Sequence, residues 1–192
     1  MTQARQQSPS GARDQAAIEE FLRDHGAGRS PHPGGTLLEH LLRVQRLLAA
    51  WGAGPDVQTA GLCHATYGTD GFATSLLPLT ERATLVALIG EPAEGLVYLY
   101  ASCDRAVVYP RIDGSSAVAF RDRFTGREHQ PSPDELRAFL DITAANELDV
   151  LAHNAELAKQ YGPGLYGFLT RAGSLLSAGA QDAVARQLGH LP

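Results

Sequence analysis

Two histidines stand in neighbouring apolar segments of this 192-residue chain, and imidazole is well suited to chemistry at neutral pH. His40 lies in the first turns of the apolar run 37–51, and His64 ends the shorter run 57–64. Imidazole nitrogens bind transition metals and exchange protons near pH 7. If the two runs are helices packed side by side, the sequence predicts a pocket lined by both rings.

Further polar residues come directly after His64 or lie in a later apolar helix. Tyr67 and Thr69 follow His64, where Gly68 turns the chain out of the core, and Asn146 lies in the helix expected from residue 132 to 157. Tyrosine and histidine perform acid–base chemistry without a metal. His64, Tyr67 and Asn146 are therefore candidate catalytic residues, and Thr69 is a candidate substrate contact.

Asp104 and Arg105 form a second polar point, close behind the apolar run 96–100. Side chains of opposite charge at such a place either contact a substrate or pair with each other in the interior. Both alternatives stand, and both residues are candidates for substrate binding.

Local signals place the elements that carry the two histidines. Thr36 is a good N-cap for a helix over 37–51, and residues 52–55 (Gly-Ala-Gly-Pro) end that helix. Because this connection is short and stiff, residues 36–64 are predicted to form two antiparallel helices. We expect the rings of His40 and His64 to lie within about 12 Å, a little over one interhelical spacing.

Helical spacing of apolar residues predicts that most of the remaining chain is helical as well. The expected helices cover 14–23, 80–89, 93–103, 132–157, 165–176 and 180–188, with a break at Gly162-Pro-Gly164. Residues 107–124 alternate in a hairpin-like way, with turn signals at Asp113-Gly114 and Thr125-Gly126. The predicted fold class is mostly all-α, a helical bundle with a short β-hairpin-like excursion near residues 107–124. Residues 1–15 are expected to be a disordered leader, and 16–192 a single domain.

Composition excludes several classes of protein. The net charge is −5 with no basic patch, which argues against a nucleic-acid binder. No apolar run is long enough to span a membrane, and no signal peptide is recognised. The two cysteines give no disulfide framework, so both are expected to be buried free thiols in a cytoplasmic protein.

In the order and spacing of four stretches, the chain resembles the HD superfamily of metallohydrolases, in particular the domains that hydrolyse guanosine tetraphosphate. The stretches are 35–44, with Gly35-Thr-Leu-Leu-Glu-His40; 60–69, with Ala60-Gly-Leu-Cys-His64; 87–97; and 144–149, with Ala144-Ala-Asn146-Glu-Leu-Asp149. The similarity spans roughly residues 30–155. It implies an HD-like helical bundle with a metal site at the two histidines.

The departures from this pattern remove the acidic residues of the site. The family's metal aspartate falls at Ala65, and its catalytic glutamate and aspartate fall at Gly68 and Thr69. The last metal aspartate falls at Asn146, although Asp149 is one turn further on. A hard divalent cation needs charged oxygen ligands, and attack on phosphate needs a metal-held water and a base. We therefore expect no pyrophosphohydrolase activity.

A softer metal is one alternative for the pocket. His32 lies on a proline-flanked loop that could fold back on His40 and His64, with Asp149 or Asp104 as an oxygen ligand. Neutral imidazoles suit zinc, iron or copper. The predicted metal set is thus His32, His40, His64 and Asp149, and the other alternative is a metal-free acid–base pocket.

The sequence therefore favours a diverged HD-like enzyme that acts on a small molecule other than a pyrophosphate. The alternative is a non-catalytic binding or regulatory domain that has kept the fold. A small-molecule ligand is the expected partner, and a second copy of the chain is a further candidate.

Overall fold

The computed structural model describes residues 14–72, 74–115 and 117–190, and the chain is mostly helical over these ranges. The elements are α1 (Gln15–Asp24), β1 (Pro31–His32), β2 (Gly35–Thr36), α2 (Leu37–Ala50), α3 (Pro55–Cys63), α4 (Arg82–Ile89), α5 (Glu91–Ser102), α6 (Arg105–Val108), β3 (Phe120–Arg121), β4 (Glu128–His129), α7 (Pro133–Ala152), α8 (Ala155–Ala172) and α9 (Ala178–Leu188). Short 3₁₀ turns cover Leu79–Glu81, Tyr109–Arg111 and Gly173–Leu175. The predicted all-α fold class with a short hairpin is confirmed.

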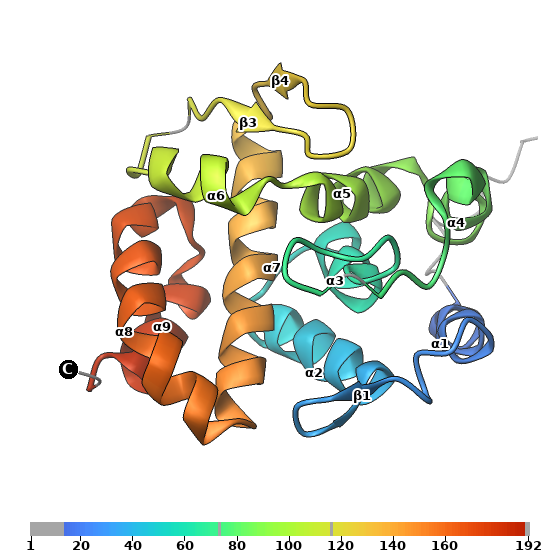
Figure 1. Ribbon diagram of the computed structural model, residues 1–192, viewed down its shortest axis with the longest axis horizontal. Coiled ribbons are helices and arrows are strands. Elements are labelled where there is room, and N and C mark those ends of the chain that lie inside the picture. Colours follow the sequence, from blue (N-terminus) through green and yellow to red (C-terminus); the bar gives the residue numbers. More distant parts are fainter. Residues whose placement is uncertain (1–13, 73, 116, 191–192) are drawn as a thin grey trace, which may run out of the picture.

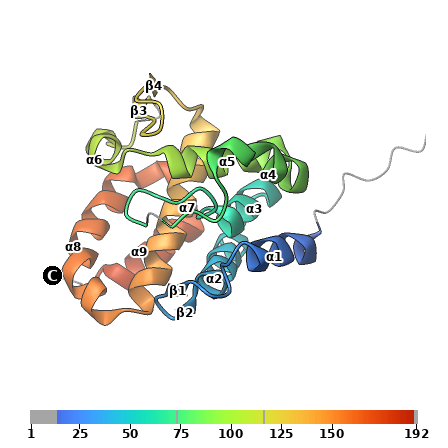
Figure 2. The same ribbon diagram turned by 45° about the vertical axis from the view of Figure 1, so that its right-hand side comes forward.

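Helix α7 is the central element of the fold (Figure 1). It packs against α2, α3 and α5 on one side and against α8 and α9 on the other, and a turned view shows the same arrangement (Figure 2). Its sequence explains this place, because twelve of its residues are buried, including Phe139, Leu140 and Leu148. A helix that is apolar on nearly all sides is stable only inside a bundle.

The starts of α2 and α7 were predicted correctly. The side chains of Thr36 and Ser132 each accept a hydrogen bond from the backbone N–H three residues on, and the backbone N–H of each cap residue donates to the carboxylate of Glu39 or Glu135. These two capping boxes satisfy backbone donors that a helix start leaves free. They fix where the two helices begin, and so where His40 and Asn146 lie.

The predicted break at Gly162-Pro-Gly164 is wrong, because α8 runs through Pro163 without interruption. The chain breaks earlier, at His153 and Asn154, where the Asn154 side chain accepts from the backbone N–H of Leu157 and caps α8. Packing of α8 against α7 and α9 outweighs the cost of a proline inside the helix.

The hairpin exists, but it lies later than the alternating pattern suggests. Residues 105–108 form α6 instead of a strand, because the carbonyl of Asp104 accepts from the backbone N–H groups of residues 107 and 108. β3 pairs antiparallel with β4, with Phe120 opposite His129, and the chain turns at Thr125-Gly126. The side chain of Asp122 accepts from two backbone N–H groups of that turn, which stabilises it.

The expected leader lies mostly outside the described residues. Asp14 caps α1 with its carboxylate and Gln15 begins the helix, so order starts slightly earlier than the predicted boundary. Cys63 and Cys103 are buried and form no disulfide, as expected. None of the helices within the described ranges is both long and apolar enough to cross a membrane.

Candidate functional site

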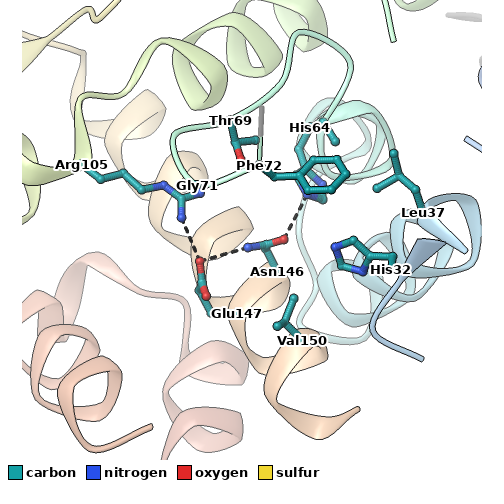
Figure 3. A pocket seen from close by; sticks show the side chains of 11 residues that line it. His32, Leu37, His64, Thr69, Gly71, Phe72, Arg105, Asn146, Glu147 and Val150 are labelled. Carbon is teal, nitrogen blue, oxygen red and sulfur yellow. Dashed lines mark hydrogen bonds and ion pairs between the residues drawn. The ribbon is translucent and has the colours of Figure 1, made fainter. Parts of the chain in front are cut away.

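A cavity of about 200 Å³ opens where α2, α3 and α7 meet the β1–β2 turn and the loop after His64 (Figure 3). It is lined by His32, Leu37, His64, Ala65, Thr69, Gly71, Phe72, Arg105, Asn146, Glu147 and Val150. We call it the histidine cavity. Five of the predicted site residues line it: His32, His64, Thr69, Arg105 and Asn146.

The two predicted histidines meet at one amide. The Nε2 atom of His40 lies 3.0 Å from Oδ1 of Asn146, and Nε2 of His64 lies 3.1 Å from the same oxygen. The ring centres are 5.3 Å apart, so the expected proximity of His40 and His64 is confirmed. Because His40 and His64 come from either end of the α2–α3 pair and Asn146 from α7, three helices must be in place to build this contact.

The Nδ1 atom of each ring also has a hydrogen-bond partner, on the side away from Asn146. Nδ1 of His64 lies 2.7 Å from the carbonyl oxygen of Gly61, one turn earlier in α3. Nδ1 of His40 lies 2.6 Å from Oδ2 of Asp149. Both histidines are fully or almost fully buried. The second contacts fix the orientation of both rings and aim their Nε2 atoms at Asn146.

Arg43 is a site residue that the sequence analysis did not identify. Its guanidinium donates two hydrogen bonds to the carboxylate of Asp149, from Nε to Oδ1 at 2.7 Å and from Nη2 to Oδ2 at 3.0 Å. It also donates to the carbonyls of Pro33 and Gly34, which form the β1–β2 turn. Its position three residues after His40 could have indicated this role, because residues at that spacing share one face of a helix. Arg43 thus ties together α2, α7 and the turn that carries His32.

The ring of His32 packs on one face of the His40 ring. Their rings stack with centres 4.0 Å apart, and the ring of Phe72 stands edge-on to His32 at 5.7 Å. The Nδ1 atom of His32 is buried and has no hydrogen-bond partner among the described residues. The predicted folding back of this loop onto His40 is confirmed.

Burial keeps the imidazoles on the cavity wall uncharged. Desolvation, together with the nearby His40, lowers the pKa of His64 to about 3. The same two causes lower the pKa of His32 to about 4. Burial by itself would raise the pKa of Asp149, but hydrogen bonds from His40 and Arg43 outweigh it and lower that pKa. At neutral pH the rings of His32 and His64 on the cavity wall are therefore uncharged, while the carboxylate of Asp149 behind His40 is ionised.

The far wall holds one ion pair. Nη1 of Arg105 donates to Oε1 of Glu147 at 3.1 Å, and Nδ2 of Asn146 donates to the same oxygen at 3.1 Å. Nη2 of Arg105 donates to the hydroxyl of Tyr100, and its backbone N–H donates to Asp70. Figure 3 shows the contacts of the lining residues, which run from Arg105 through Glu147 and Asn146 to His64. Glu147 was also missed, although it is the direct neighbour of Asn146 in the last motif.

Four predicted site residues do not line the cavity: His40 and Asp149 lie behind its wall, and Tyr67 and Asp104 lie elsewhere. Tyr67 points elsewhere, and its hydroxyl donates to the buried carboxylate of Glu94 at 2.8 Å. Arg82 binds both oxygens of Glu94, so the Tyr67 hydroxyl belongs to a separate buried ion pair. Burial and the carboxylate raise the pKa of Tyr67. The roles assigned to Tyr67 and Asp104 are therefore corrected, because Asp104 does not line the cavity and instead pairs with Arg121 at 3.5 Å.

The donor set does not fit a metal ion. Among the described residues, no group of three or more His, Cys, Asp or Glu side chains is arranged to hold one. The Nε2 atoms of His40 and His64 converge, but the amide of Asn146 stands between them. Asp149 faces the Nδ1 side of His40, and its two oxygens are bound by Arg43. It orients His40 and is not placed as a ligand beside the two Nε2 atoms.

Comparison with known proteins adds one match. A family model described as a domain of unknown function (DUF6817) matches residues 21–105. No curated protein matches the chain significantly, and neither does any solved structure. The matched range includes His32, His40, His64 and Arg105, but it ends before α7, which contributes Asn146, Glu147 and Asp149.

Proposed function

We propose that this protein is a diverged HD-like domain that binds a small molecule in the histidine cavity. The observation that carries the proposal is the convergence of His40 and His64 on Asn146 at the cavity wall. The buried rings of His40 and His64 and the half-buried amide of Asn146 are held there in fixed orientation by a polar network that joins three helices. The HD resemblance supports the same place, since its two histidines are His40 and His64.

The walls suit a small ligand with polar and apolar parts. Leu37, Phe72 and Val150 supply apolar surface, and His64, Asn146 and Glu147 supply polar atoms. Ligand sites commonly combine such walls with a few fixed polar groups. A volume of about 200 Å³ is below the roughly 300–1,000 Å³ of pockets for drug-sized ligands, so the ligand is small.

Metal-dependent phosphate hydrolysis is not part of the proposal. Ala65 lines the cavity at the place where the family's metal aspartate falls, and Asn146 contributes a neutral amide. With Asp149 held by Arg43, the cavity offers no free pair of carboxylates for a divalent cation. The metal content of protein purified without added metal checks this point, and a stoichiometric transition metal would contradict it.

The proposal is tested by filling the cavity. Val150→Phe adds a ring to a half-buried position on the wall, and Val86→Phe makes the same change at a half-buried position on α4 away from it. Thermal-shift and ligand-observed NMR screens with small compounds are run on both variants and the unmodified protein. Compounds that bind should lose affinity for Val150→Phe and keep it for Val86→Phe. Equal binding to both variants would place the site elsewhere.

Catalysis is the second candidate, and one observation favours it. Glu147 and His64 lie on one wall of the cavity and are joined through Asn146, so a carboxylate and an imidazole face the same bound molecule. The low pKa of His64 makes it a weak proton acceptor at neutral pH, which assigns the role of base to Glu147. For any substrate found by the screen, Glu147→Gln should then abolish turnover while binding persists.

A further inference from the structure

A second hollow lies between the end of α2 and helix α9, and we call it the α2–α9 groove. Leu47, Ala50 and Trp51 line it on the α2 side, and Gly179, Asp182 and Arg186 line it on the α9 side. Its volume is about 600 Å³, and among the described residues it shares none of its lining with the histidine cavity. The groove is therefore a separate candidate site.

Close packing fixes both walls of the groove. A Cβ atom at Gly179 would lie 2.8 Å from Cα of Trp51, closer than nonbonded carbon atoms approach each other, so this contact needs a glycine. Leu148 of α7 is buried and also lines the groove, whereas Leu47 and Trp51 remain half-buried. The groove thus offers apolar surface that the described part of the chain leaves partly uncovered.

Two opposite charges lie on the α9 wall. Asp182 and Arg186 are exposed and lie one helical turn apart on the same face. Neither side chain makes an ion pair or a hydrogen bond with another described residue. Both charges are therefore available to a partner that presents a positive and a negative group at the same spacing.

A second copy of α9 presents these two groups at that spacing. When two identical helices pack antiparallel about a two-fold axis, each residue on one side of the axis faces its counterpart from the other side. An axis at the level of residue 184 places Asp182 opposite the partner's Arg186, and by symmetry forms the same pair a second time. The exposed side chains of Ala178 and Ala185 are small, which lets a second helix approach α9 closely.

We propose that the α2–α9 groove is the interface of a symmetric homodimer, in which α9 of each chain lies in the groove of the other. The apolar walls provide the affinity, because exposed ion pairs contribute little, and the two reciprocal ion pairs fix the antiparallel register. With two helices from each chain, the contact is smaller than a standard interface, so we expect a dissociation constant of about 10 µM. The proposal concerns another face of the molecule and does not depend on the function proposed for the histidine cavity.

Dilution of the unmodified protein tests whether it dimerises. Sedimentation velocity should show mostly dimer at about 100 µM and mostly monomer at about 1 µM, which are concentrations on either side of the expected dissociation constant. Trp51 is the only tryptophan of the chain and lines the groove. Its fluorescence should therefore change over the same range of concentrations if the contact lies at this groove.

Charge reversal tests the register of the two helices. Asp182→Arg and Arg186→Asp each bring like charges together at two places in the interface, so each should weaken dimerisation at least about tenfold. The double variant Asp182→Arg/Arg186→Asp exchanges the two charges, restores both pairs and should dimerise again. Glu20→Arg, at an exposed position of α1, is the control and should leave dimerisation unchanged.

A larger side chain in the groove tests the same contact without relying on the ion pairs. Ala50→Arg adds a long side chain at an exposed position that lines the groove, and this variant should be monomeric. Ala49→Arg is the matched control, because Ala49 is also exposed on α2 and does not line the groove. This control should dimerise like the unmodified protein.

Three results would overturn the proposal. A chain that stays monomeric at about 100 µM would do so, and the groove would then be open to a different occupant. A dimer that persists in Asp182→Arg or in Ala50→Arg would place the contact on another face. An exchange variant that stays monomeric would contradict the antiparallel pairing of Asp182 with the partner's Arg186.

Discussion

His40 and Asp149 are 109 positions apart in the sequence, and their side chains share a hydrogen bond of 2.6 Å in the buried interior. Arg43 binds the same carboxylate from the other side. Three side chains therefore depend on one another: Asp149 orients the ring of His40, and Arg43 keeps Asp149 ionised. The resulting unit places His40 against Asn146 and anchors the β1–β2 turn.

Replacing Asp149 by asparagine should destabilise the protein by about 3 kcal/mol, because Arg43 then has no counter-charge in a largely buried place. The pKa of Asp149 is lowered in the folded state, so its contribution is present above the ordinary value of 3.8 and is lost as the pH falls through the folded value. In urea unfolding, the free energy of unfolding of Asp149→Asn should thus be lower than that of the unmodified protein by a constant amount from pH 5 to 8. This difference should shrink in stronger acid. Asp182→Asn, at an exposed position of α9, is the control, and a loss of stability no larger than in this control would refute the role of Asp149.

Acidification should weaken the fold partly through His64. Its pKa is about 3 in the folded protein and about 6.5 when unfolded, so the unfolded chain binds more protons between these values. From pH 7 to pH 5 this costs about 2 kcal/mol. His64→Gln should remove that part of the loss, whereas exposed His190→Gln should not. The free energy of unfolding is measured at both pH values, and equal losses in the unmodified protein and His64→Gln would contradict a neutral buried His64.

Tyr67→Phe should affect stability and leave the cavity unchanged. The hydroxyl of Tyr67 donates to a buried carboxylate, and hydrogen bonds to charged groups are worth about 1.5–3 kcal/mol. The melting temperature should therefore fall, while compounds found by the screen keep their affinity. Tyr161→Phe, at a position that is 55% exposed, should change neither quantity. Loss of ligand binding in Tyr67→Phe would contradict this prediction and support a role for Tyr67 in the functional site.

Guanosine tetraphosphate should not be hydrolysed, even with added manganese. Ala65, Gly68, Thr69 and Asn146 stand where the resemblance places acidic residues, so the metal and the attacking water have no ligands and no base. The assay follows release of pyrophosphate over time. Turnover at ordinary enzymatic rates, about one per second or more, would refute this interpretation of the substitutions.

The sequence by itself determined the elements that have local signals. Thr36 and Ser132 predict the starts of α2 and α7 because their capping side chains act within one turn. The short connection at 52–55 predicts the packing of α2 on α3, and hence the meeting of His40 and His64. Asn146 followed from the order of the motifs, and its contact with both rings agrees with that prediction.

Tertiary structure alone decided which polar groups pair and which helices continue. Tyr67 and Arg105 are both polar residues that follow closely on an apolar helix, yet one faces Glu94 and the other faces the cavity with Glu147. The partners lie 27 and 42 positions away, so no local spacing indicates them. Pro163 shows the same limit for the backbone, since packing of α8 outweighs a strong local breaking signal. In each case the deciding energy comes from contacts that exist only after the chain has folded.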